Sequence, residues 1–122
     1  MPLEVFTAYG AAGRLEATLR ASGYLFLSSA LLRRIHAEAA EAVVLLFDQE
    51  AKLLAVRAPR PDDPPPALRS VSKEPSGVAV NIVPLLASYN FPKPRRKLRL
   101  PVQTRGDMLL VEMKTVDGGE AL

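Results

Sequence analysis

The stretch Gly23-Tyr-Leu-Phe-Leu-Ser-Ser-Ala-Leu-Leu32 decides the fold, because a similar stretch follows it 54 residues later in the chain. Residues 77–86, Gly-Val-Ala-Val-Asn-Ile-Val-Pro-Leu-Leu, align with it without a gap. With one residue inserted at a later turn, so that the offset becomes 55, residues 54–56 align with residues 109–111. Few aligned positions are identical, so chance similarity is the alternative. The shared order of a glycine, a helix start, paired leucines and a final hairpin favours an internal repeat of roughly fifty residues.

Each copy is predicted to be strand, strand, helix, strand, strand. In the first copy, Ser22-Gly23 is typical of a hairpin turn, with a strand on either side. Ser29 is expected to cap a helix that runs from Ala30 to about Ala42. The predicted strands cover residues 15–20, 24–27, 43–47 and 52–57, with a turn over 48–51.

The second copy repeats this pattern. Pro84 suits the first turn of a helix, where a missing N–H costs nothing, and this helix is expected to end near Asn90. A closing hairpin is expected over 97–102 and 108–113, around Arg105-Gly106-Asp107. The sequence therefore divides into a first unit (1–58), a proline-rich linker (59–67), a second unit (68–114) and a flexible tail (115–122).

The predicted fold class is α+β, as a strand-rich pseudo-two-fold tandem repeat that forms a small barrel or packed sheets. Leu98 and Leu100 alternate with Lys97 and Arg99, which predicts a strand with one buried and one exposed face. Residues 43–47 are apolar on both faces and must be covered on both. We expect the interior of the pseudo-dimer to cover them, and the alternative is a homodimer contact.

Composition indicates a folded globular chain of 122 residues, 48% hydrophobic and 24% charged. Without cysteine, and with neither an apolar run long enough to span a membrane nor a signal peptide in view, a cytoplasmic location is expected. Eleven prolines and few Asn and Gln residues are typical of thermophile proteins, so a thermophilic source is a further hypothesis.

The sequence predicts no enzyme, metal site or cofactor. His36 is the only histidine, and a zinc or copper site would need several carboxylates around it. Ser28 and Ser29 are better explained by helix capping than as nucleophiles, and no phosphate-binding or dinucleotide-binding glycine pattern occurs. The pair Asp62-Asp63 lies in the linker, where solvated acids are expected.

Basic residues supply the strongest functional signal. Five cations occupy seven positions from Lys93 to Arg99, and Arg33-Arg34 lie in the corresponding helix of the first copy. Such clusters can neutralise phosphates and release counterions, although a solvated surface is the alternative. The predicted nucleic-acid contacts are Arg20, Arg33, Arg34, Arg95, Arg96, Lys97 and Arg99.

A hairpin ending in glycine, an apolar strand, a short helix with paired leucines and a closing hairpin resembles the AbrB-type swapped-hairpin domains. The tandem arrangement is similar to the MraZ type, although Tyr24 and Val78 stand where members have an arginine. The chain is also similar to short bacterial proteins of unassigned function that contain such a unit twice. The resemblance implies a transcriptional regulator that binds double-stranded DNA. The alternative is a protein-interaction or scaffold module, with a homodimer as one form.

Overall fold

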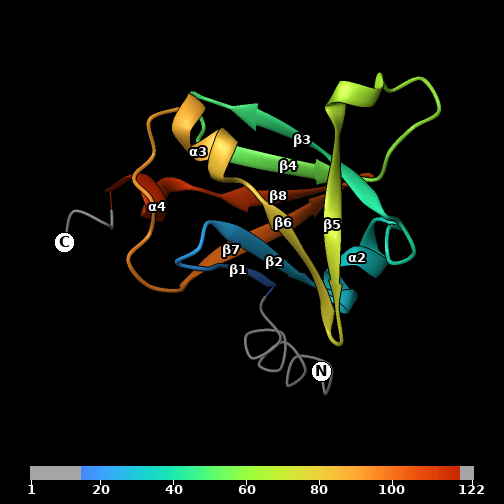
Figure 1. Cartoon of the computed structure of the whole chain (residues 1–122), viewed down its shortest axis with the longest axis horizontal. Helices are drawn as coiled ribbons and strands as arrows, with labels where there is room; N and C mark the ends of the chain where they lie inside the picture. The colour runs from blue at the N-terminus through green and yellow to red at the C-terminus, as the bar shows by residue number, and fades with distance from the viewer. Residues whose placement is uncertain (1–14, 119–122) are drawn as a thin grey trace, which may run out of the picture.

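A computed structural model describes residues 15–118, and within them eight antiparallel strands close into a barrel (Figure 1). Around the barrel the strands follow the order β1-β2-β6-β5-β3-β4-β8-β7. The prediction of a strand-rich fold is confirmed, and of its two alternatives, a small barrel or packed sheets, the chain forms the barrel. The strands are β1 Glu16–Leu19, β2 Tyr24–Ser28, β3 Ala42–Asp48, β4 Leu53–Arg57, β5 Leu68–Glu74, β6 Gly77–Asn81, β7 Leu98–Arg105 and β8 Met108–Glu112.

The helical segments are short: α2 Ser29–Arg34, the 3-10 turn η1 Pro65–Ala67, α3 Val83–Ser88 and α4 Lys114–Gly118. Two predictions for α2 are wrong. Ser28 caps it, because the Ser28 Oγ accepts a hydrogen bond from the Leu31 N–H at 3.3 Å. The helix also ends at Arg34 and does not continue toward Ala42.

Backbone geometry after α2 explains its early end. His36 has a φ of 55°, a left-handed conformation that stops a helix, and the Ala37 N–H turns back to the Leu32 carbonyl. Burial of the Ile35 and Ala37 side chains then directs the chain into the core. After α3, Asn90 has a φ of 60° and residue 91 bonds back to residue 86 in the same way.

Strand pairing joins the two halves of the chain throughout the barrel. Each strand of residues 16–57 pairs on one side with a strand of residues 68–112, as β1·β7, β2·β6, β3·β5 and β4·β8. Within each half only the hairpins β1·β2, β3·β4, β5·β6 and β7·β8 pair. The halves therefore share one barrel and one core.

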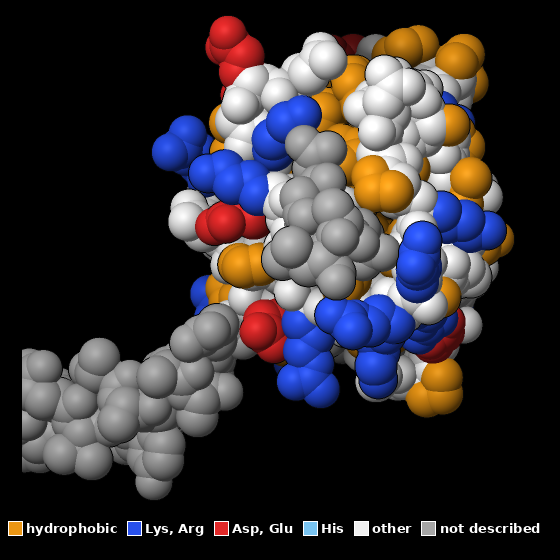
Figure 2. Space-filling model, turned by 90° about the vertical axis from the view of Figure 1, so that its left-hand side faces the viewer, with side chains coloured by type: hydrophobic (Ala, Val, Ile, Leu, Met, Phe, Trp, Pro, Cys, Tyr) orange, Lys and Arg blue, Asp and Glu red, His pale blue; other side chains and the backbone are white. Residues whose placement is uncertain are grey.

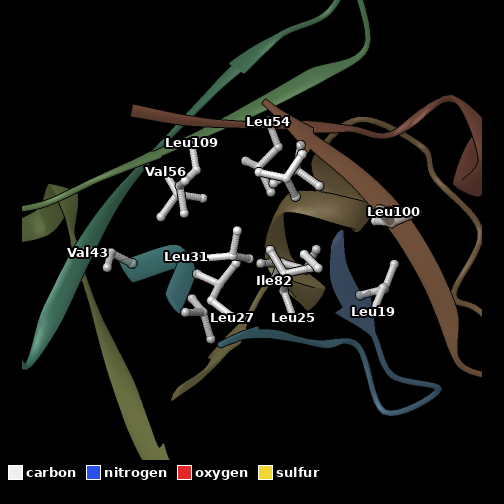
Figure 3. Packing of buried hydrophobic residues seen from close by; sticks show 14 of the residues in the cluster. Leu19, Leu25, Leu27, Leu31, Val43, Leu54, Val56, Ile82, Leu100 and Leu109 are labelled. Carbon is white, nitrogen blue, oxygen red and sulfur yellow. The ribbon is translucent and has the colours of Figure 1, made fainter. Parts of the chain in front are cut away.

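Leucine side chains fill the barrel from the strands and from α2 (Figure 3). Leu100 is buried and Arg99 exposed, as the alternation of β7 predicts. In β3 the structure covers Val43 and Val44, but the outward Leu46 is 45% exposed. The barrel therefore covers only part of the apolar surface of β3, and the outward face remains exposed at Leu46.

The proline-rich linker is fixed to the barrel by an ion pair. Both terminal guanidinium nitrogens of Arg57 donate to the Asp63 carboxylate, at 2.9 and 2.8 Å, and the Arg60 N–H donates to it as well. The Arg57 and Asp63 side chains are only 10% and 9% exposed, so the prediction that Asp63 is a solvated acid is wrong. Arg60 in turn binds Asp107 in the β7–β8 turn, so the linker is held at two points.

The hydrogen bonds from Arg57, then that from the Arg60 N–H, lower the pKa of Asp63 to about 2. A carboxylate whose pKa falls on folding stabilises the protein above its unfolded pKa of about 3.9 and loses this contribution as the pH drops toward 2. We expect Asp63→Asn to flatten the decline of the melting temperature between about pH 4 and pH 2. Circular dichroism melts of both proteins measure it. Asp62→Asn, a change at the exposed neighbouring acid, is the control, and an unchanged slope in Asp63→Asn would contradict the expectation.

The C-terminal part differs from the predicted flexible tail within the described residues. Residues 114–118 form α4, and its Val116 side chain is fully buried in the core. The rest of the predicted tail, 119–122, lies outside the described residues, as does the start of the first unit, 1–14.

Candidate nucleic-acid interface

The loop between α3 and β7 presents its cations on a fixed support. Phe91 and Pro94 are buried, and the Phe91 and Phe47 rings pack edge to face with a centroid distance of 5.6 Å. This loop runs along the left of Figure 1. Figure 2 looks at that side of the molecule and shows several Lys and Arg side chains close together in the lower part of the picture. We call the exposed residues Lys93, Arg95, Arg96 and Lys97 the basic loop.

Strand β7 continues this cationic surface along the outside of the barrel. Arg99 is exposed opposite Thr18 of β1, because its neighbours on the strand point inward. Beside it lies an outer groove of about 390 Å³, bounded by β7, β1 and the start of α2. The groove is lined by Leu15, Glu16, Thr18, Ser28, Ala30, Leu31 and Arg99.

Helix α2 adds two cations beside the outer groove. Ala30 lines the groove, and Arg33 and Arg34 follow it by three and four residues, which places all three on one side of a helix. Leu31 and Leu32 are buried on the other side. The start of α2 and Arg99 thus line the same groove, and Arg33 and Arg34 follow at the end of α2, whereas the basic loop lies at the start of β7.

Arg20, the remaining predicted contact, is held by an acid. Its two terminal nitrogens each donate to one Glu74 carboxylate oxygen at 2.8 Å, and its guanidinium lies 5.1 Å from the centre of the Phe26 ring. The hydrogen bond from Arg20 lowers the pKa of Glu74. The charge of Arg20 is thus compensated within the protein. The two residues are 54 positions apart, and no sequence signal pointed to this pair.

Other cations of the surface keep their charge uncompensated. Among residues 15–118, no ion pair or side-chain hydrogen bond involves Arg33, Arg34, Lys93, Arg96, Lys97 or Arg99. The charge distribution along the sequence agrees with this. Residues 75–106 contain six Lys and Arg residues and no Asp or Glu. A segment without acids offers its cations no partner nearby in the sequence.

Within residues 15–118, no group of three His, Cys, Asp or Glu side chains is placed to hold a metal ion, and His36 is exposed after α2. None of the described helices has the length and apolar character to cross a membrane.

Fold and surface together define this protein as a small antiparallel β-barrel with exposed cations in the basic loop, on β7 and on α2; we call the basic loop, Arg99, Arg33 and Arg34 together the basic face. No protein-family model matches the chain, and neither does a curated protein or a solved structure.

Proposed function

We propose that the protein is a non-catalytic regulator that binds double-stranded DNA through the basic face. The observation that carries this proposal is the uncompensated charge of Arg96 and Lys97, on a loop that the buried Phe91 and Pro94 anchor, and of Arg99 on the adjoining strand β7. A loop whose backbone is already held loses less backbone freedom on binding, so more of the attraction of its cations for phosphate is retained.

Phosphate contacts on this face follow the line of β7. The basic loop contacts the DNA backbone at the start of β7, and Arg33 and Arg34 contact the DNA backbone beyond the outer groove. Glu16 lies inside the groove and repels a phosphate, so we place the contacts on the rim. Phosphate contacts position a protein on DNA without reading sequence, so this face supplies affinity more than specificity.

We further propose that the two halves are copies of one swapped-hairpin unit. Exchanging β1–β4 with β5–β8 leaves the order of strands around the barrel unchanged, which supports the proposal. The helix ends also support it: His36 and Asn90 both have positive φ, and each lies 54 residues from the other. In this arrangement the cations of α2 and of β7 come from different copies.

Neutralising two cations of the basic loop, as Arg96→Gln with Lys97→Gln, is expected to weaken DNA binding. If each contacts one phosphate, the slope of log affinity against log salt falls in magnitude by about two, roughly one per lost contact. Fluorescence anisotropy of a labelled duplex, titrated with wild type and variant between about 50 and 200 mM salt, measures both slopes.

The matched control is Arg69→Gln with Lys73→Gln, which removes the same charge from the exposed part of β5. In the barrel order β5 is four strands from β7 in either direction, so these cations lie on the opposite side. The control is expected to keep the wild-type slope. Absence of wild-type binding at about 50 mM salt, or equal losses in both double variants, would refute the proposal.

A further inference from the structure

The outer face of strands β3, β4, β8 and β7 has an apolar centre. Strand register sets Leu46 beside Ala55 and Ala55 beside Leu110, in one row across three strands. Leu46 is 45% exposed, and Leu53 and Met108, in the rows on either side, are half-buried. These side chains line a hollow of about 260 Å³, so the face carries both an apolar projection and a recess.

Opposite charges lie at two corners of this face. Asp48 ends β3, in the row of Leu53, whereas Arg105 ends β7, in the row of Met108. Both line the same hollow, at diagonally opposite corners of the four strands. The Asp48 carboxylate is fixed by the N–H groups of Glu50 and Ala51, and within residues 15–118 Arg105 has no ion-pair partner.

We propose that this face binds a second copy of the same chain. A two-fold axis in the plane of contact, at right angles to the line from Asp48 to Arg105, places Asp48 of each copy against Arg105 of the other. The same operation sets Leu46 of one copy over Met108 of the other, in the recess. A two-fold contact needs a patch that is complementary to itself, and an acid and a cation at opposite corners of an apolar centre meet that condition.

The size of the face indicates a weak dimer. Four strands at about 4.8 Å spacing give a width of only about 15–20 Å, below that of a standard stable interface. We therefore expect a dissociation constant in the range of about 1–100 μM, typical of small contacts with few anchoring residues.

Sedimentation equilibrium without nucleic acid, from about 5 μM to about 500 μM, tests the proposal. Arg105→Asp and Asp48→Arg are each expected to weaken the dimer at least about tenfold, by placing like charges together, and the double variant is expected to recover wild-type affinity within about threefold. Asp48→Asn keeps the acceptor of the turn and should weaken the dimer less than Asp48→Arg. It also tests the charge if Asp48→Arg fails to fold.

Leu46→Glu introduces a charge at the centre of the face and is expected to give a monomer. Arg69→Asp, a matched charge reversal on β5, should leave the dimer unchanged. A wild type that stays monomeric throughout the concentration range overturns the proposal. So does a dimer that is insensitive to Leu46→Glu, or single reversals that the double variant fails to rescue.

Discussion

Gly77→Ala is expected to lower the free energy of unfolding by about 3 kcal/mol, at the upper end of the usual cost of overpacking. A Cβ at this position would overlap the carbonyl oxygen of Leu27 and lie 2.9 Å from both Ser28 Cα and the Phe26 ring. Two of these atoms belong to the backbone of β2, so no side-chain rotation relieves the clash. Strands β2 and β6 must separate, and they form one of the contacts between the two halves.

Urea denaturation followed by circular dichroism measures this loss. Gly106→Ala is the matched control, because Gly106 has a φ of 59° but nothing within 4 Å of the added Cβ. It should cost only about 1 kcal/mol, from the left-handed backbone alone. A Gly77→Ala protein that unfolds within about 1 kcal/mol of wild type would show that β2 and β6 approach less closely than described.

Leu31→Ala is expected to cost about 3 kcal/mol, within the range found when a buried leucine is truncated and a cavity remains. Leu31 extends from α2 into the interior of the barrel and is only 2% exposed (Figure 3). The surrounding strands are bonded on both sides, so they cannot close over the vacated space.

Leu85→Ala is its counterpart in α3, 54 residues later, where the leucine is only partly buried. Its expected cost is about 1 kcal/mol, because less apolar surface is transferred from water. Urea denaturation of both variants measures the difference. Equal costs would mean that the two helices contribute alike to the core, contrary to their burial.

Local signals predicted most of the hairpins correctly. Ser22-Gly23 does turn between β1 and β2, with Gly23 at a φ of 92°, and alternation along β7 identified its buried face. Helix length was less predictable. The helical spacing of apolar residues continues past Arg34, so it does not show where the helix ends. The helix ends because His36 takes a left-handed conformation, which accompanies the burial of its neighbours in the core.

Longer-range features could not be derived in the same way. Alternation shows which face of a strand is buried but not which strand lies beside it, so the pairing of β2 with β6 was not predictable. The linker composition suggested a solvated Asp63, whereas Arg57 binds it at the barrel surface. Within the candidate interface, the cluster at 93–99 was visible in the sequence. Two further features depend on closure of the barrel and could not be predicted from the sequence. Arg99 lies beside the start of α2, and Arg20 forms an ion pair with Glu74.

The mutual pairing of the halves also determines when the protein can fold. Strand β1 has β7 as one neighbour, so the sheet around it is complete only after residue 101 has been synthesised. Contacts so distant along the chain slow folding, because a large loop must close before they form. On the ribosome, the first half therefore exposes unpaired strand edges until β7 and β8 have emerged, and a chaperone has its best opportunity to bind during that interval.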